Sequence, residues 1–117
     1  VGYINAHGTS TPVGDVGEID AVRRVFGKGN TPPVSSTKSM TGHAQGAAGA
    51  LEAIFSLLML DNDFITKSIN VHTLDSALDA SEIALERVDN AGLDSVMTNS
   101  FGFGGTNGSM ILSKYKG

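Results

Sequence analysis

The pattern of hydrophobic and polar positions predicts short strands that alternate with helices in the first part of the chain. Residues 1–6 are mostly apolar and predict a strand that ends directly at His7. Over residues 15–26 the apolar positions recur at helical spacing, after an acidic pair that resembles a capping box. A Pro-Pro pair precedes residues 34–38, which predict a second short strand that carries Lys38 toward the same edge of a sheet as His7.

Residues 44–60 predict a longer helix, which begins with a cluster of glycine and alanine. Its large apolar side chains lie on one broad face that we expect to be buried in the core: Leu51, Ile54, Phe55, Leu58 and Met59. Further strands are predicted over residues 65–71, 83–88, 96–100 and 110–114, the last two as a hairpin. This order of elements indicates a layered α/β domain.

Composition narrows the possible classes of protein. The chain has 117 residues, 40% of them hydrophobic, which fits one domain spanning residues 1–117. Its 8 basic and 12 acidic residues give a net charge of -4 without a basic tract, so nucleic acid is not an expected partner. The absence of cysteine excludes disulfides and thiolate metal sites in this sequence.

Two observations bear on location. Nothing at the start of the sequence resembles a signal or transit peptide. The most apolar stretch, residues 47–60, is shorter than the roughly 20 residues of a membrane crossing and contains Glu52. We therefore expect no membrane association and a cytoplasmic location.

Candidate chemistry lies in three glycine- and hydroxyl-rich motifs. They are His7-Gly8-Thr9-Ser10-Thr11, Lys38-Ser39-Met40-Thr41-Gly42-His43 and the run from Asn99 to Asn107. Two imidazoles can hydrogen-bond a developing oxyanion or enolate, and a glycine-rich turn leaves backbone amides free for the same charge. Because His43 precedes a predicted helix, the helix dipole should favour its neutral form. A nucleophile is missing, since the sequence has no cysteine.

Together, in this order and with these gaps, the three motifs resemble the C-terminal half of the β-ketoacyl-acyl carrier protein synthases, the elongating condensing enzymes. The match covers essentially the whole chain. It implies the C-terminal half of a thiolase-like α/β fold, with layered helices on a mixed five-stranded sheet. It also implies a decarboxylative condensation in fatty acid elongation, in which malonyl-acyl carrier protein reacts with an acyl-enzyme thioester. The family's cysteine belongs to an N-terminal half, so residues 1–117 alone are expected to be inactive.

The resemblance implies a role for each matching residue. His7 and His43 match the two histidines that donate hydrogen bonds to the malonyl thioester carbonyl and stabilise the enolate. Lys38 matches the lysine beside them, and Glu18 matches an acidic residue that pairs with this lysine. Phe103 matches a gating phenylalanine whose backbone amide contributes to the oxyanion hole.

Binding roles follow from the same resemblance. Thr9 and Thr11 match threonines that bind the phosphopantetheine arm, and the mobile gating loop also includes Phe101, Gly102 and Gly104. Where some relatives hold a structural monovalent cation, this chain has Asn5, Glu52, Thr98 and Asn99. No other cofactor is implied. The implied partners are an acyl carrier protein and, in the full-length enzyme, a second copy of the protein as a homodimer.

Other functions are compatible with parts of the pattern. A non-catalytic condensing-enzyme-like partner that determines chain length would share the fold, as would a thiolase or an initiating synthase. A freestanding module that binds carrier-protein arms without chemistry is a further alternative. Initiating synthases pair histidine with asparagine and thiolases use a second cysteine, so neither suits His7 together with His43.

Individual motifs also have simpler interpretations. A single histidine is more often structural than catalytic, and Thr9 and Thr11 could be turn-forming hydroxyls. The loop 102–105 lacks the strand-loop-helix order and the Lys-Ser/Thr of a nucleotide-binding loop. Residues 61–63, Asp-Asn-Asp, lack the glycine and distal glutamate of a calcium loop. The joint occurrence of the three motifs favours one active site.

Overall fold

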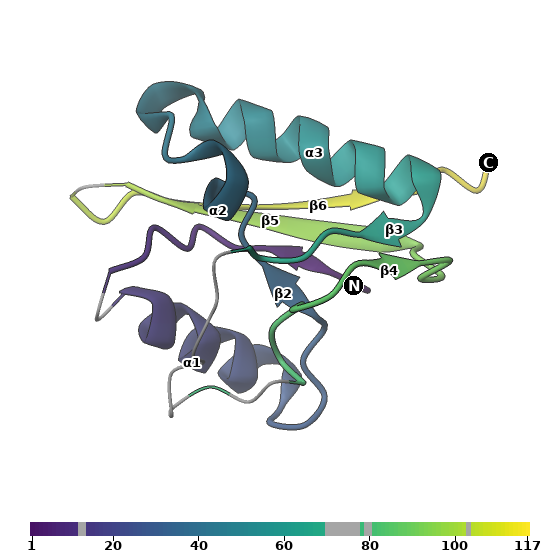
Figure 1. Ribbon diagram of the computed structural model, residues 1–117, viewed down its shortest axis with the longest axis horizontal. Coiled ribbons are helices and arrows are strands. Elements are labelled where there is room, and N and C mark those ends of the chain that lie inside the picture. Colours follow the sequence, from purple (N-terminus) through teal and green to yellow (C-terminus); the bar gives the residue numbers. More distant parts are fainter. Residues whose placement is uncertain (12–13, 70–77, 79–80, 103) are drawn as a thin grey trace.

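The computed structural model describes residues 1–11, 14–69, 78, 81–102 and 104–117, and it has an α/β architecture (Figure 1). Its elements are β1 (Ile4–Asn5), α1 (Gly14–Phe26), β2 (Val34–Ser35), α2 (Lys38–Thr41), the 3₁₀ turn η1 (Gln45–Ala47), α3 (Ala48–Asn62), β3 (Phe64–Ile65), β4 (Val88–Asp89), β5 (Ser95–Phe101) and β6 (Asn107–Ser113). None of the helices in these ranges combines the length and the hydropathy that a bilayer crossing requires.

The main sheet is mixed and has the strand order β2-β1-β5-β6. β1 runs parallel to both β2 and β5, whereas β5 and β6 form an antiparallel hairpin from Ser95↔Ser113 to Phe101↔Asn107. This hairpin confirms the prediction for the last two strands. Because β1 and β5 are parallel neighbours, the residues that follow their carboxyl ends emerge at the same edge of the sheet.

The predicted fifth strand of this sheet is only partly present. Ile83 forms a single parallel bridge with Val34, at the outer edge of β2. Val88 instead belongs to β4, which pairs with β3 in a separate two-stranded sheet. The predicted strand over residues 65–71 is likewise reduced to β3, and residues 70–71 lie outside the described ranges. The sequence pattern could not show which of these short apolar segments would find a partner, because strand pairing is a long-range contact.

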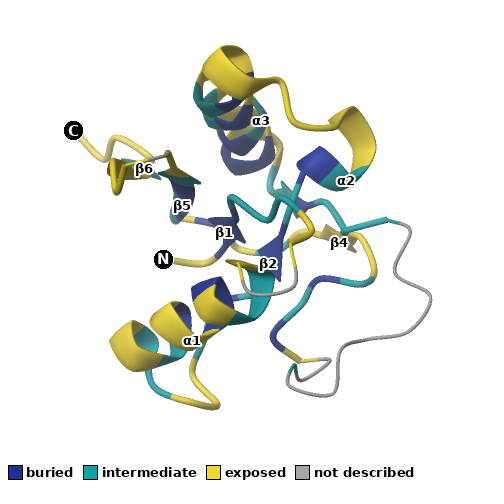
Figure 2. Ribbon diagram, turned by 90° about the vertical axis from the view of Figure 1, so that its left-hand side faces the viewer, coloured by how far each residue is buried: buried dark blue, intermediate teal, exposed yellow. Residues whose placement is uncertain are grey.

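Helices cover both faces of the main sheet: α1 lies on one face, and α2 and α3 lie on the other (Figures 1 and 2). The α1 side of the core contains Ile4, Ala6, Ile19, Val22 and Val34. The α3 side contains Tyr3, Met59, Leu60, Ile65, Ala84, Leu93 and Val96. The short strand β1 is therefore buried between the two layers, which fixes the segment that leads into His7.

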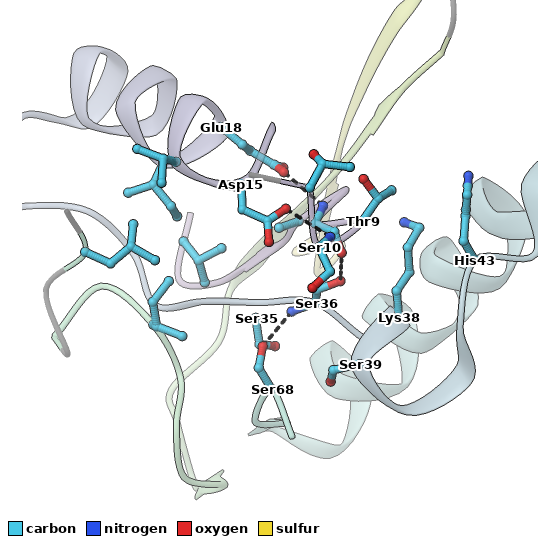
Figure 3. Close-up of a pocket in the computed structure, with 18 of the residues that line it drawn as sticks. Thr9, Ser10, Asp15, Glu18, Ser35, Ser36, Lys38, Ser39, His43 and Ser68 are labelled. Carbon is cyan, nitrogen blue, oxygen red and sulfur yellow. Dashed lines mark hydrogen bonds between the residues drawn. The ribbon is translucent and has the colours of Figure 1, made fainter. Parts of the chain in front are cut away.

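Helix α1 has nearly the predicted bounds, but the predicted capping box does not form, because Asp15 and Glu18 instead accept amides of the loop that follows β1. The Thr11 hydroxyl accepts a hydrogen bond from the Gly14 amide and caps the start of the helix. At the other end, Gly27 has a φ of +88° and donates its amide to the Arg23 carbonyl, which is the usual way for glycine to end a helix. Glu18 lies on the buried face of α1 and points toward the chain that follows β1 (Figure 3).

The buried face of α3 differs from the predicted one. Leu51, Ile54 and Leu58 are 36%, 53% and 49% exposed. Met59 is buried and Phe55 is half-buried, as predicted, but the remaining buried positions are Ala48, Glu52, Ser56 and Leu60. The helix is apolar on most of its circumference, so its sequence does not specify one buried face. Polar contacts decide the orientation, because Ser56 bonds Asn5 and Glu52 pairs with Lys38.

Lys38 also departs from its predicted position. We predicted that it would lie at the end of a strand over residues 34–38, but β2 ends at Ser35 and Lys38 is the first residue of α2. Hydrogen bonds from Met40 and Thr41 to the Thr37 carbonyl form this short helix immediately after the strand. The turn buries the Lys38 side chain and directs it toward α3.

Candidate active site

His7 lies directly beyond the carboxyl end of β1, and the first turns of α1 hold its backbone. The Glu18 carboxylate accepts hydrogen bonds from the amides of His7, at 2.8 Å, and Gly8, at 3.0 Å. Asp15 accepts the amide of Ser10 at 3.1 Å. Three amides of one loop are thereby bound to two carboxylates of one helix, so the loop that carries His7 has a defined path.

The neighbouring strand makes a second contact with this loop. The Ser36 hydroxyl donates to the Gly8 carbonyl at 3.1 Å, and the Ser36 amide donates to the Ser68 hydroxyl at 3.0 Å. Gly8 has a φ of +37°, and a Cβ atom there would lie 2.8 Å from the Ser36 Cβ. Glycine is therefore required at position 8 for two independent reasons. The sequence motif signalled Gly8, but nothing in the pattern identified Ser36 or Ser68 as its supports.

The structure brings together the two predicted histidines. The ring centroids of His7 and His43 are 5.6 Å apart, and the ring planes are inclined at 86°, which is an edge-to-face arrangement. Phe101 from the third motif contacts the same imidazole, with centroids 5.5 Å apart and planes inclined at 59°. Residues of all three motifs therefore meet at His7, as the sequence analysis predicted.

The expected partner of Lys38 is corrected by the structure. Its ammonium group forms an ion pair with the Glu52 carboxylate rather than with Glu18, and both side chains are at least 95% buried. Glu18 instead uses its two oxygens for the amides of His7 and Gly8. The sequence shows Glu52 within an otherwise apolar helical segment. A glutamate that is buried in such a helix requires a cationic or hydrogen-bonded partner, so this residue was recognisable as a candidate partner for Lys38.

Burial and nearby positive charge set the protonation of the site. Burial lowers the pKa of His7, and Lys38 and then His43 lower it further, while Asp15 opposes them. Burial raises the pKa of Glu18, and the two amide hydrogen bonds oppose this rise. A lowered pKa keeps the His7 imidazole neutral near pH 7, with one N–H available to donate.

A cleft of about 610 Å³ lies beside these groups. Its polar wall includes Thr9, Ser10, Lys38 and His43, and the polar side chains can be followed in Figure 3. Its apolar wall includes Val16, Ile19, Val34, Leu78 and Ile83. The predicted binding residues Thr9 and Thr11 both line the cleft, although the Thr11 hydroxyl already accepts the Gly14 amide. The cleft can accommodate an elongated ligand with both polar and apolar parts.

The glycine-rich loop follows β5. Phe101 was predicted to belong to this loop, but it is the last residue of β5 and is paired with Asn107. The Gly102 amide donates to the Thr106 carbonyl at 2.7 Å and closes the turn. Gly104 and Gly105 have φ values of +82° and +84°, which only glycine adopts without strain. Phe103, the predicted gating residue, lies outside the described residues.

The four predicted cation ligands are buried on β1, α3 and β5, and one of them pairs with Lys38: Asn5, Glu52, Thr98 and Asn99. Asn5 bonds Thr37 and Ser56, and Asn99 accepts the Ser109 hydroxyl at 2.7 Å. One oxygen of Glu52 and the Thr98 hydroxyl are buried and have no hydrogen-bond partner within the described part of the chain. Two unsatisfied oxygens fit an oxygen-ligated cation, although Lys38 already neutralises Glu52. The described residues contain no group of three or more histidine, aspartate or glutamate side chains that could hold a metal.

Comparison with known proteins agrees with this geometry. A family model described as the C-terminal domain of β-ketoacyl synthase matches residues 1–72. Across its full length the chain is 62% identical to 3-oxoacyl-(acyl-carrier-protein) synthase 1 of Haemophilus influenzae, and it is 53% identical over 116 residues to the Escherichia coli K12 protein of the same name. It spans 29% and 28% of these relatives, respectively.

A solved structure gives the same result for the fold. The complex of a type II polyketide synthase acyl-carrier protein with its ketosynthase, AntDE:AntF, matches 99% of the chain with a TM-score of 0.90 and 32% identity. The chain covers 28% of that ketosynthase structure's chain. The helices and the mixed sheet therefore have the arrangement found in one part of a ketosynthase.

Proposed function

Because this chain belongs to the β-ketoacyl synthase family and has the C-terminal half of its thiolase-like α/β fold, we propose that it supplies the decarboxylation half of a condensing active site. The proposed reaction is the condensation of malonyl-acyl carrier protein with an acyl-enzyme thioester in fatty acid elongation. The observation that carries the proposal is the pairing of His7 with His43, because His43 lines the cleft together with Lys38.

In the proposed reaction, His7 and His43 donate hydrogen bonds to the carbonyl oxygen of the malonyl thioester. When the bond to the terminal carboxylate breaks, carbon dioxide leaves, and its bonding electrons form an enolate on the thioester. The two N–H donors stabilise the negative charge that develops on the enolate oxygen. The low pKa of His7 suits this role, because a neutral imidazole keeps a donor without carrying a buried charge.

The enolate carbon then attacks the acyl thioester, and the cysteine thiolate leaves as the β-ketoacyl product forms. Since residues 1–117 contain no cysteine, the proposal places this nucleophile in polypeptide outside them. We propose that the Phe103 amide contributes to the oxyanion hole for this step and that Phe103 acts as the gate. The positive φ values of Gly104 and Gly105 support a loop whose path is set by its backbone.

Substrate delivery in this proposal depends on an acyl carrier protein. Thr9 and Thr11 line the cleft, where their hydroxyls would bind the phosphopantetheine arm, while Gly102 and Gly104 shape the adjacent loop. The AntDE:AntF structure is of a carrier protein in complex with its own ketosynthase, which supports this choice of partner. A homodimeric full-length enzyme and a cytoplasmic location, suggested by the resemblance to carrier-protein-dependent synthases, complete the proposal.

A structural monovalent cation is also part of the proposal. Asn5, Glu52, Thr98 and Asn99 would hold it, and the unpartnered oxygens of Glu52 and Thr98 support this assignment. Such an ion would fix α3 against β5 and take no part in the reaction. No other cofactor is needed for the chemistry proposed.

The decisive experiment uses the natural polypeptide that contains residues 1–117. It measures carbon dioxide release from malonyl-acyl carrier protein and, with an acyl donor, formation of the β-ketoacyl product. We expect both activities in the intact polypeptide and neither in residues 1–117 alone. Carbon dioxide release without product would favour the alternative of a non-condensing partner subunit, and no release from the intact polypeptide would refute the proposal.

A further inference from the structure

Among the residues that the structure describes, none forms a hydrogen bond with the Nδ1 atom of His7 that would orient its imidazole. In most sites, one ring nitrogen is bound to a backbone or carboxylate oxygen, and this bond fixes the tautomer and the orientation of the ring. The Nδ1 atom of His7 is buried and has no partner among the described residues. Glu18 holds the backbone amide of His7, but this bond does not fix the side-chain torsions. Contacts with the faces and edges of the ring must therefore orient it.

Two aromatic rings make such contacts. The ring of His43 meets that of His7 at 86°, and the ring of Phe101 meets it at 59°. The first contact is edge-to-face, which aromatic quadrupoles favour, whereas the second is a tilted contact at van der Waals range. His43 is itself a proposed donor to the substrate and lies in the loop between α2 and η1. The Phe101 side chain has no hydrogen-bond donor or acceptor, so it can act on His7 only through packing.

The position of Phe101 makes it suitable as a fixed wall. It is the last residue of β5, is paired with Asn107, and is followed by the turn that the Gly102 amide closes on Thr106. β5 is the parallel neighbour of β1, the strand that leads into His7. Phe101 at the end of β5 and His7 just beyond the end of β1 therefore lie at the same edge of the sheet, where the paired strands hold the two segments side by side.

We propose that Phe101 is a positioning residue, which holds the His7 imidazole in its edge-to-face arrangement with His43. The inference rests on the proposed function and deepens it. In this proposal Phe101 acts on the orientation of His7. It is neither part of the mobile gate nor a contact of the substrate. A ring contact restricts rotation of the imidazole by packing, and unlike a hydrogen bond to Nδ1 it does not select the tautomer.

The test compares Phe101→Met, Phe101→Tyr and Phe64→Met in the natural polypeptide that contains this sequence. Methionine has a similar volume and hydrophobicity but no flat ring, whereas tyrosine keeps the ring. Phe101 is 37% exposed, so neither change should prevent folding. Phe64 is the control, because this half-buried aromatic side chain packs beneath Arg87 in the separate β3-β4 sheet.

The measured quantities are kcat and KM for carbon dioxide release from malonyl-acyl carrier protein. In Phe101→Met we expect kcat to fall by about tenfold, with KM within about twofold of the wild type, because misorientation of a catalytic group affects the chemical step. Phe101→Tyr should retain the wild-type kcat, and so should Phe64→Met. An unchanged kcat in Phe101→Met would overturn the proposal. So would a rise in KM with kcat unchanged, because that result indicates that Phe101 contacts the substrate.

Crystal structures of the wild type and Phe101→Met give a readout that does not depend on activity. We expect one His7 ring orientation in the wild type and two or more in the variant. A single, unchanged orientation in Phe101→Met would contradict positioning by Phe101. If the wild type releases no carbon dioxide, the proposed function fails, while the ring orientations still decide whether Phe101 positions His7.

Discussion

The ammonium group of Lys38 and the carboxylate of Glu52 form a buried ion pair that joins α2 to α3. The sequence analysis had assigned Lys38 to the catalytic site and Glu52 to a cation site, and it did not predict their contact. The pair explains why an apolar helix turns a glutamate inward, and it connects the stability of the fold to the position of the lysine in the site.

Replacement of Glu52 should be strongly destabilising. Glu52→Ala leaves the Lys38 charge buried without a partner, and we expect the free energy of unfolding to fall by about 3–5 kcal/mol. The double variant Lys38→Met, Glu52→Leu should recover most of this loss, because it removes both charges. Urea unfolding of the natural polypeptide and its variants measures the effect. Equal stability of Glu52→Ala and the wild type would show that the pair contributes nothing.

The histidine pair should act as a unit in decarboxylation. We expect His7→Ala and His43→Ala each to lower kcat for carbon dioxide release by about 10²–10³-fold, in line with the loss of one oxyanion donor. The double variant should lose less than the product of the two effects, since one donor alone positions the enolate poorly. His72→Ala, outside the three motifs, is the control. Fully multiplicative effects would indicate that the two imidazoles act independently.

Asp63 should make stability depend on pH in the acid range. It ends α3 in a left-handed conformation, and its carboxylate accepts the amides of Leu93 at 2.7 Å and Gly92 at 3.1 Å. These bonds, with Leu93 first, lower its pKa. The folded state therefore binds fewer protons than the unfolded state between the two pKa values, so the stabilisation is present above about pH 3.9 and lost as the pH falls through the folded-state pKa.

The matched test compares the wild type with Asp63→Asn and Asp61→Asn from pH 2 to pH 7. An asparagine side chain at position 63 tolerates the left-handed backbone but offers a single acceptor oxygen without charge. The stability difference between wild type and Asp63→Asn should be constant near neutral pH and should shrink in acid. Asp61→Asn, at an exposed position on the last turn of the same helix, is the control for the loss of one carboxylate charge. If the stability difference between wild type and Asp63→Asn grew as the pH fell, the proposed effect of the two amide hydrogen bonds on Asp63 would be contradicted.

The exposed apolar face of α3 should cause residues 1–117 to self-associate when they are produced alone. Ile54, Leu57 and Leu58 are 53%, 47% and 49% exposed and line a shallow hollow with Tyr115. Exposed apolar clusters of this kind mark interfaces. Sedimentation velocity should show oligomers that Ile54→Lys with Leu58→Lys reduces, whereas Val25→Lys, at a 75% exposed position on α1, leaves them unchanged. A monomer at all concentrations would contradict this expectation.

The sequence by itself determined the elements whose signals are local. Helix α1 has apolar spacing and a terminal glycine, and its bounds were predicted to within a residue, although its hydroxyl cap at Thr11 was not predicted. The β5-β6 hairpin follows from two β-permissive segments joined by a glycine-rich turn. The three motifs also predicted that His7, His43 and Phe101 would meet, because their resemblance to one family constrains residues that are distant in the chain.

Tertiary structure alone decided which partners the buried polar groups find. Glu18 was expected beside Lys38, but its oxygens bind the amides of His7 and Gly8, and Lys38 pairs with Glu52. The buried face of α3 was likewise set by Glu52 and Ser56 rather than by its leucines. The physical reason is that local propensity depends on neighbours in sequence, whereas the cost of burying a charge or an unpaired hydrogen-bonding group depends on which segments pack together.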